Sequence, residues 1–314
     1  MKVNLGTLKR LSPRDVWKHE AKDFTPWLAE NIGQLADILG LDLELIETEP
    51  SVGTFSVDIV ARDLSSGNLV VIENQFGETN HDHLGKLLTY ASGIDAYALV
   101  WVSESFKDEH KQALEWINER TDEDTSLFGL ELEVLQIDSS APAFNLKPIV
   151  VPNKWQKATR IGTRGGSPRS EAYRDFFQQL IDELREKHHF TRARVAFAQN
   201  WYSFTSGIRG VSYGASFAQG ERMRVEVYLD RGDSKENKNM FDWLGSRKEQ
   251  IESKLGASLQ WERLDDRRAS RVALYRPGSI DNDEANLAEI RSWAVNQLLA
   301  FKDVFGLLLK EYGK

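Results

Sequence analysis

The order of helical and strand-like patterns along the 314 residues predicts two domains of different class. The first half shows one helical pattern, three strand-like runs and then an alternation of helix and strand, which predicts an α/β domain with an αβββαβ core and a mixed sheet. In the second half most strand-like runs follow one another, which predicts an α+β domain with a largely antiparallel sheet. A polar segment rich in glycine and arginine separates the two halves. We therefore expect domains at 1–155 and 170–314, joined by a linker at 156–169.

The predicted first domain begins with the helical pattern TPWLAENIGQLADILG, in which Thr25 can cap the start and Gly40 can end the helix. Four apolar residues share one face of this helix: Leu28, Ile32, Leu35 and Leu39. Strand patterns follow in LDLELIE, TFSVDIVARD and NLVVIENQF, and a short turn at 65–67 joins the last two into a hairpin. Thr79 can then cap a helix that runs to about Gly93. The remaining patterns predict a buried strand in AYALVWV, a helix in FKDEHKQALEWINERT and a strand in LELEVLQI.

The predicted second domain begins with a helix at 171–187. Strand patterns follow in ARVAFAQNWYSF, GVSYGASFA and RMRVEVYLD, and then a helix at about 235–255. Two more strand patterns, SLQWERL and SRVALYRPG, precede a long helix that Asp281 or Asn282 can cap and that runs to about Tyr312.

Composition and charge narrow the class of protein. With 41% hydrophobic and 28% charged residues and no cysteine, the chain is not a disordered tail, a collagen-like fibre or a disulfide framework, and any metal must bind oxygen or histidine. The start has no apolar signal-peptide core and the longest apolar run, 96–102, is too short to span a bilayer, so we expect a cytoplasmic protein without a membrane partner.

The net charge of −8 is unevenly distributed between the two halves, because residues 1–160 carry 15 basic and 26 acidic groups and residues 161–314 carry 25 basic and 22 acidic groups. An anionic ligand would meet the second half more readily.

Polar residues interrupt the strongest strand patterns of the first half. Asp58 lies in SVDIVA, and Glu73 and Gln75 lie in VVIENQFG, where side-chain alternation places both on one face. If the hairpin closes through Ser65 and Ser66, Asp58 and Glu73 become cross-strand partners. Opposed carboxylates lie about 4.5–5.5 Å apart at Cβ and repel each other unless a cation neutralises them. The alternatives are a solvated sheet face and a register slipped by one residue.

A divalent metal ion is the cation that this pair suits. Mg²⁺ takes oxygen ligands and keeps several waters, so two carboxylates and a backbone carbonyl suffice as its protein shell. Bound there, Mg²⁺ or Mn²⁺ would lower the pKa of a water and stabilise charge on a phosphate oxygen, which is the chemistry of phosphodiester cleavage.

These motifs resemble a known superfamily. The order α, β, β, β, α, β, with an aspartate on the second strand and Glu-x-Lys on the third, is the pattern of the PD-(D/E)XK nucleases, matched here by Asp58 and Glu73 with Gln75 in the place of the lysine. FTPWLAENI, VDIVA, VVIENQFG and HDHLGKLLTYASGI are similar to a bacterial family of unassigned function, in which a nuclease-like domain precedes a second conserved domain that LQWERLDDRRASRVALYRPG resembles. The resemblance implies a nuclease-like first domain. The neutral Gln75 departs from it, because the lysine of the superfamily is thought to activate the attacking water.

Another cation can compensate for the missing lysine. His83, Lys86 and Tyr90 form one stripe on the helix after Glu73, from which Lys86 could reach a phosphate; the alternative is a solvated lysine. The resemblance also suggests a glutamate on the first helix near the metal, and Glu30 is the candidate, with a surface position as the alternative. His81 and His83 point to different sides of their helix and do not form a zinc pair.

The second half combines arginine with aromatic residues, as nucleic-acid platforms often do. Arg192 and Arg194 would share one face of a strand, as would Arg222 and Arg224. The full set expected to bind nucleic acid is Arg192, Arg194, Arg222, Arg224, Arg267, Arg268 and Arg271. An ordinary mixed-charge surface is the alternative.

The sequence thus favours a nuclease that depends on Mg²⁺ or Mn²⁺ and acts on nucleic acid, with DNA as the expected substrate and bacterial defence or restriction as the role that the resemblance implies. The expected site is Asp58 and Glu73 on the metal, assisted by Gln75, Lys86 and Glu30. The alternative is a catalytically inactive module of nuclease fold that binds nucleic acid, a nucleotide or a protein partner. A structural subunit of a larger complex is a third hypothesis, and a homo-oligomer is compatible with each.

Overall fold

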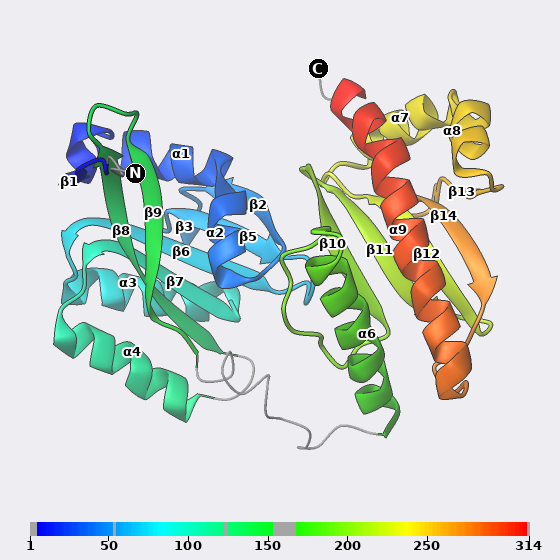
Figure 1. Ribbon diagram of the computed structural model, residues 1–314, viewed down its shortest axis with the longest axis horizontal. Coiled ribbons are helices and arrows are strands. Elements are labelled where there is room, and N and C mark those ends of the chain that lie inside the picture. Colours follow the sequence, from blue (N-terminus) through cyan, green and yellow to red (C-terminus); the bar gives the residue numbers. More distant parts are fainter. Residues whose placement is uncertain (1–4, 53–54, 122–124, 153–167, 313–314) are drawn as a thin grey trace. The chain divides into compact units, whose positions relative to one another are not determined.

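The chain forms two compact units in the computed structural model, which describes residues 5–52, 55–121, 125–152 and 168–312 (Figure 1). The first unit comprises 1–39, 45–63 and 67–162, and the second comprises 40–44, 64–66 and 163–314. Of the expected linker, residues 156–167 lie outside the described residues, and 168–169 already belong to a helix. In the described part of the chain no helix is long and apolar enough to cross a membrane.

The first unit contains a mixed sheet, as expected. Its strands follow the order β1-β8-β7-β6-β5-β2, with β9 also paired to β8. Strands β6, β7 and β8 are parallel to one another, whereas β5, β1 and β9 pair antiparallel to their neighbours. A short ladder of β3 with β4 stands apart from this sheet. The strands are β1 (Leu8–Leu11), β2 (Leu43–Thr48), β3 (Ser51–Val52), β4 (Phe55–Ser56), β5 (Ile59–Asp63), β6 (Leu69–Glu78), β7 (Ala98–Ser105), β8 (Ser126–Ile137) and β9 (Ala143–Val150).

Helices cover the sheet and complete the core of the first unit. α3 packs on β6 and β7, and α4 packs on β8 and β9. Leu87 and Tyr90 of α3 and Leu114 of α4 are buried against Val71 and Trp101 of the sheet. The helical segments are a 3-10 turn η1 (Pro13–Asp15), a π-helical turn η2 (Glu20–Phe24), α1 (Thr25–Glu30), α2 (Ile32–Leu39), α3 (His81–Ile94) and α4 (Asp108–Arg120).

The first predicted helix is wrong in two details. It is split into α1 and α2, because the Asn31 side chain donates to the Trp27 carbonyl at 2.8 Å and competes with the helical hydrogen bonds. Thr25 does not cap it, since its buried hydroxyl accepts a hydrogen bond from Asn74 Nδ2 at 2.9 Å. Gly40 follows the last helical residue with φ 61°, as expected of a helix stop.

Two other local expectations also fail. Asn80, not Thr79, caps α3 by accepting from the His83 amide, because the Thr79 hydroxyl accepts from the Lys107 amide and contacts His110. The strand expected over TFSVDIVARD breaks into β4 and β5, since the chain bends at Asp58. Strands β1 and β9 were not expected from the pattern, because most of their residues are exposed and do not alternate cleanly between apolar and polar.

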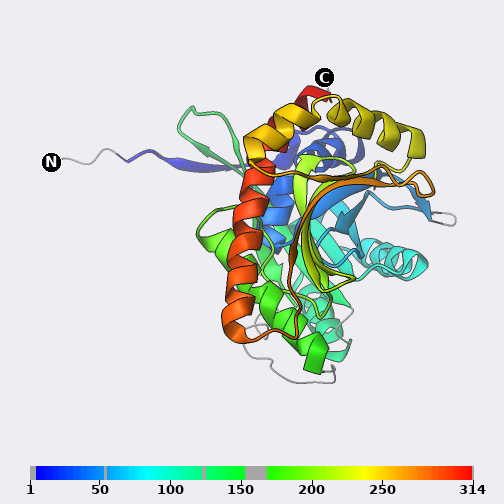
Figure 2. The ribbon, with the colours of Figure 1, turned by 90° about the vertical axis from the view of Figure 1, so that its right-hand side faces the viewer.

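The second unit contains an antiparallel sheet with helices on one face, which confirms its predicted class. The strand order is β10-β11-β12-β14-β13, and every pair is antiparallel. α9 runs along the sheet over β10, β11 and β12 and also contacts α6 (Figures 1 and 2). Met223, Val225 and Val227 of β12 face this core. The elements are α6 (Pro168–Glu186), β10 (Trp201–Ile208), β11 (Val211–Ala218), β12 (Arg222–Leu229), α7 (Ser234–Gly245), α8 (Lys248–Leu255), β13 (Gln260–Glu262), β14 (Ser270–Pro277) and α9 (Glu284–Tyr312).

The segment that carries Arg192 and Arg194 is irregular, so the strand expected there is wrong. The regular strand begins only at Trp201. Side chains of α6 occupy the backbone groups that a neighbouring strand would need: Gln178 bonds the Arg194 carbonyl and the Ala196 amide, and Arg185 donates to the Ala193 carbonyl. Local side-chain bonds therefore replace a sheet ladder.

Two helix boundaries in the second unit differ from expectation. The helix predicted at about 235–255 is divided into α7 and α8 at Ser246 and Arg247, where the Ser246 hydroxyl donates to the Trp243 carbonyl at 2.7 Å. Asp283 caps α9 by accepting from the Asn286 amide at 2.9 Å. Asp281 and Asn282 do not cap it, because their side chains bond Ser279 in the turn before.

Candidate active site

The hairpin of β5 and β6 has the expected register. Ile59 pairs with Ile72 and Val60 with Val71, which confirms the register predicted from the sequence. Extending the ladder by one position places Asp58 opposite Glu73, just before β5 begins at Ile59. The two acidic residues therefore lie at the mouth of the hairpin, beyond its last paired strand residues.

The open edge of β6 beyond Ile72 anchors two carboxylates. Because β5 pairs with β6 only as far as Ile72, the amides of Asn74 and Phe76, two residues apart, need other acceptors. Asp58 Oδ2 accepts from the Asn74 amide at 2.7 Å, and Glu20 Oε2 accepts from the Phe76 amide. The same stretch of β6 carries Glu73 and Gln75. The amides and side chains of this one strand therefore bring the polar groups of the site together.

Glu20 belongs to the site although the sequence did not indicate it. It begins the π-helical turn η2, which has no apolar periodicity of the α-helical kind. Aromatic packing places this turn: Trp17 and Phe24 lie 5.0 Å apart between ring centroids, and Phe24 lies 5.5 Å from Phe76. The run of aromatic residues on both sides of Glu20 was the available signal, but it does not tell which strand the turn will meet.

Buried oxygen atoms without hydrogen-bond donors mark the centre of the site. The Glu73 and Gln75 residues are each only 4% exposed. Glu73 Oε2 and Gln75 Oε1 have no hydrogen-bond partner among the described residues, while Gln75 Nε2 donates to the Glu78 carbonyl at 2.7 Å and fixes the orientation of the amide. Buried acceptors without a donor cost free energy, so their presence calls for a missing cation or donor.

The electrostatics point the same way. Burial raises the pKa of Asp58, and the charge of Glu20 raises it further against the lowering effect of the Asn74 amide. Burial likewise raises the pKa of Glu73, as does the neighbouring charge of Asp58. Burial also raises the pKa of Glu20. A raised carboxyl pKa means that the charged form is poorly compensated by the chain itself.

The stripe predicted on α3 faces the acidic cluster. The ammonium of Lys86 lowers the pKa of Glu20, Asp58 and Glu73 alike, which places its charge close to all three. His83 Nε2 lies 4.0 Å from Glu73 Oε1. Burial raises the pKa of Tyr90, and the charges of Glu73 and Asp58 raise it further, to about 12.

The histidines of α3 diverge, as expected. His83 lies toward Glu73, and burial lowers its pKa, which favours the neutral ring. His81 instead meets His110 of α4, with 2.8 Å between His81 Nδ1 and His110 Nε2. The second nitrogen of His110 contacts the Thr79 hydroxyl, which completes a chain from β6 to α4. This chain is a link between elements and is separate from the acidic cluster.

The residues present fit a hard divalent cation with few protein ligands. Glu30 is exposed at the last residue of α1, and its place in the site stays a prediction. Among the described residues no group of three or more histidine or acidic side chains is arranged to hold a metal. Asp58 and Glu73 with the unpartnered Gln75 Oε1 nevertheless offer oxygen donors, and Mg²⁺ commonly binds one or two carboxylates and completes its shell with water.

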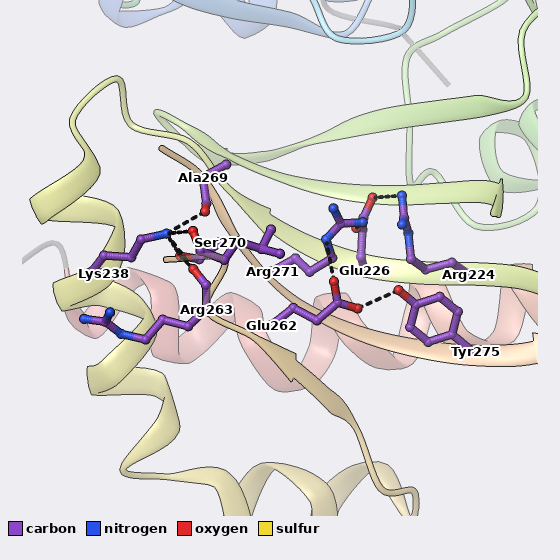
Figure 3. Close-up of polar contacts among 10 residues, drawn as sticks. Arg224, Glu226, Lys238, Glu262, Arg263, Ala269, Ser270, Arg271 and Tyr275 are labelled. Atoms are coloured by element: carbon purple, nitrogen blue, oxygen red, sulfur yellow. Dashed lines mark hydrogen bonds and ion pairs between the residues drawn. The ribbon is translucent and has the colours of Figure 1, made fainter. Parts of the chain in front are cut away.

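In the second unit several expected nucleic-acid contacts are paired with carboxylates (Figure 3). Arg224 Nη2 lies 3.1 Å from Glu226 Oε1, and Arg271 Nη1 lies 3.3 Å from Glu226 Oε2. Arg271 Nε lies 3.2 Å from Glu262 Oε2, although not aligned for a hydrogen bond, and Tyr275 donates to Glu262 at 2.7 Å. We call these five residues, Arg224, Glu226, Glu262, Arg271 and Tyr275, the paired network. Two arginines and two glutamates make its net charge zero.

A buried lysine braces the loop beside this network. Lys238 is 8% exposed and donates to the carbonyls of Arg263, Leu264 and Ala269 and to the Ser270 hydroxyl (Figure 3). Leu264 has φ 54°, so these bonds hold a strained left-handed turn before β14. Sequence reasoning did not single out Lys238, because its partners are backbone oxygens.

The other expected arginines differ in their surroundings. Arg268 forms two hydrogen bonds of 2.7 Å with the carboxylate of Asp230. Arg222 lies over the Tyr275 ring, 4.5 Å from its centroid. Arg267 is exposed in the braced loop. Among the expected arginines, Arg222 and Arg267 are the better placed to meet an anion.

Comparison with known proteins supports the second predicted domain and leaves the first untested. A family model described as a domain of unknown function (DUF4268) matches residues 172–308. This confirms the conserved second domain that the sequence predicted, over less than half of the chain, and membership of the PD-(D/E)XK superfamily stays a prediction. No curated protein matches the chain. The chain is also similar to the crystal structure of a repair endonuclease from Pyrococcus abyssi, at 20% identity over 31% of this chain and 43% of that chain, with a TM-score of 0.27. A likeness at this level carries no argument about fold or activity.

Proposed function

We propose that the chain is a metal-dependent nuclease of the PD-(D/E)XK type that hydrolyses phosphodiester bonds, with DNA as substrate and Mg²⁺ or Mn²⁺ held by Asp58 and Glu73. The observation that carries the proposal is the buried Glu73 with the partly buried Asp58, both with raised pKa, next to the oxygens of Glu73 and Gln75 that have no hydrogen-bond partner among the described residues. Within the described part of the chain, Lys86 is the cation whose charge lowers the pKa of all three carboxyls, Glu20, Asp58 and Glu73. A divalent cation would satisfy these oxygens and remove the repulsion.

Each residue has a distinct role in this proposal. The bound cation would supply a water of lowered pKa and stabilise charge on a phosphate oxygen. The side-chain amide of Gln75 is fixed because its Nε2 donates to the Glu78 carbonyl. Its Oε1 can therefore accept a hydrogen bond from the attacking water and orient that water. Glu20, whose pKa burial raises, is suited to take up the proton that this water loses. Lys86 supplies the positive charge that the lysine replaced by Gln75 would give.

The second unit would contribute affinity for nucleic acid. Arg222 and Arg267 are its leading contacts, and Arg192, Arg194, Arg224, Arg268 and Arg271 remain expected ones. A role in bacterial defence or restriction is the biological setting that we propose for such an activity.

Plasmid nicking in Mg²⁺ and in Mn²⁺ tests the proposal. Wild type should nick the plasmid, and Asp58→Asn and Glu73→Gln should each lose at least about 100-fold in rate, because both hold the cation. Glu115→Gln, an exposed carboxyl of α4, is the matched control and should keep the wild-type rate. Equal rates for wild type and Asp58→Asn would refute the catalytic role.

One observation favours the non-catalytic alternative, namely the neutral Gln75 in the position of the lysine. Under that alternative the chain binds nucleic acid equally well in a chelator, and it does not cleave nucleic acid whichever metal is added. A Mn²⁺-dependent rise in the melting temperature that is absent from Asp58→Asn would support the metal site without relying on activity.

A further inference from the structure

Arg14 is held at the edge of the acidic cluster by a rigid turn. It is the central residue of η1, whose N-cap Ser12 accepts from the Arg14 amide at 3.3 Å. The Asp15 carboxylate in turn accepts from the Ser12 amide at 3.1 Å, which closes a reciprocal capping box. The backbone of Arg14 is therefore fixed although its side chain is exposed.

The guanidinium of Arg14 lies against the strand that builds the site. Its central carbon is 5.3 Å from the centroid of the Phe76 ring, and the Phe76 amide is the group that binds Glu20. The charge of Arg14 also acts on the Glu20 carboxyl. No carboxylate within the described residues forms an ion pair with Arg14 at 4 Å or less, unlike Arg224 or Arg271 of the paired network.

A charge count shows what the site needs from Arg14. Three carboxylates, Glu20, Asp58 and Glu73, exceed the charge of one divalent cation by one unit, and Lys86 cancels that excess. The charge of Glu104, which also raises the pKa of Glu20, then leaves the site negative, so that it would repel a phosphodiester monoanion. Arg14 supplies the next positive charge, in a planar fork that suits two phosphate oxygens.

The surface beside η1 has a hollow that could take a nucleic-acid strand. A hollow of about 460 Å³ lies between the segment Arg10–Pro13 and the carboxyl ends of β6 and β7, where Gly77, Glu78 and Glu104 line it. Arg14 follows Pro13 directly and so lies at the rim of this hollow, outside its lining. Gly77 has φ 87° and nothing within 4 Å of the position of a Cβ, so the wall there is open. Glu104 acts electrostatically on Glu20, which shows that the hollow adjoins the acidic cluster.

We propose that Arg14 is a phosphate-binding residue of the nuclease site, which contacts the non-bridging oxygens of a nucleic-acid strand lying along this hollow. The inference rests on the proposed function, since it assigns the substrate contact of that same site. It differs from the roles of Gln75 and Lys86, because Arg14 comes from the N-terminal turn and not from the hairpin or α3.

Binding without cleavage tests Arg14 separately from catalysis. A fluorescent DNA oligonucleotide is titrated in Ca²⁺ with wild type, Arg14→Gln, Arg14→Lys and Lys18→Gln, the last an exposed cation of the same segment. We expect Arg14→Gln to weaken binding about 10-fold and to reduce the salt slope by about 1, with Lys18→Gln unchanged. Arg14→Lys, which keeps the charge but loses the fork, should lie between them.

The binding data either support or overturn the role of Arg14. Equal affinity and equal salt slope for Arg14→Gln and Lys18→Gln would overturn the inference, as would a wild type that does not bind the oligonucleotide. Binding that depends on Arg14 in a protein that never cleaves in Mn²⁺ would support the inference and refute the proposed hydrolysis. A thermal melt of each variant verifies folding, which the exposed Arg14 side chain should not affect.

Discussion

The two units each contain a cluster of charged side chains on neighbouring strands, and they balance these charges in opposite ways. In the paired network of the second unit, Glu226 is 8% exposed, but two arginines contact its two oxygens. In the first unit, Glu73 is 4% exposed and has one oxygen to which no described residue donates a hydrogen bond. Burial raises the pKa of both carboxyls, but the arginines lower that of Glu226 whereas Asp58 raises that of Glu73 further.

This difference separates a cluster whose charges the chain balances from one whose charges it leaves unbalanced. The paired network is neutral without any ligand, so it can serve to fix β12, β13 and β14 together. The acidic cluster needs a positive charge from outside the chain. Buried charge alone is therefore weak evidence of a site, and unbalanced buried charge is stronger evidence.

Neutralising one glutamate in each cluster should change stability in opposite directions. Glu226→Gln should lower the free energy of unfolding by about 3 kcal/mol, because it leaves Arg224 and Arg271 without their counter-charge. Glu73→Gln should raise it by about 1 kcal/mol at neutral pH without metal, because it removes the free energy cost of burying or protonating this carboxyl beside Asp58. Urea titrations of both variants measure this, and a loss of stability in Glu73→Gln would show that its charge is compensated.

The cleavage rates of variants at Glu20 and at Glu30 test which glutamate of the first unit belongs to the site. Glu20→Gln should slow cleavage about 10-fold, because Glu20 lies at the acidic cluster, and Glu30→Gln should change the rate less than twofold. Rates at saturating Mn²⁺ measure both. The reverse order would place the functional glutamate at the end of α1 and not in η2.

The pH dependence of stability should give the smallest effect. The folded state holds the protons of Glu20, Asp58 and Glu73 more tightly than the unfolded chain does, because each pKa is raised. The stability that they contribute is therefore complete below about pH 4 and is lost as the pH rises through the raised pKa values.

Without metal, the melting temperature of wild type should fall over that range by the equivalent of about 1 kcal/mol, and the double variant Asp58→Asn/Glu73→Gln should fall less. Mn²⁺ should reverse the loss in wild type, because the cation replaces the protons. Parallel pH profiles for wild type and the double variant would contradict this account.

The sequence predicted those parts of the candidate site that depend on local periodicity. The pairing that places Asp58 opposite Glu73 follows from a short turn and the two-residue period of strands, and the stripe of His83, Lys86 and Tyr90 follows from the period of a helix. The expected roles of these residues await the experiments above.

The parts that the sequence did not predict depend on contacts between distant segments. Glu20 reaches the site because aromatic rings carry η2 to β6, 56 residues away. Arg194 leaves the predicted strand because side chains of α6 take the backbone groups there. The pairing of Arg271 with Glu226 and Glu262 depends on the order of β12, β14 and β13 in the sheet, which no single pattern specifies.

The open edge of β6 gives the candidate site an all-or-none character. Main-chain amides two residues apart hold Asp58 and Glu20, while Glu73 and Gln75 project from the residues beside those amides. A slip of β6 by one residue would turn Asn74 and Phe76 toward the position of Glu73 and Gln75 and would withdraw both amide anchors at once. Selection that keeps the site would therefore act on the length of the hairpin as strictly as on its acidic residues, and insertions between β5 and β6 should be tolerated only where they leave this alignment intact.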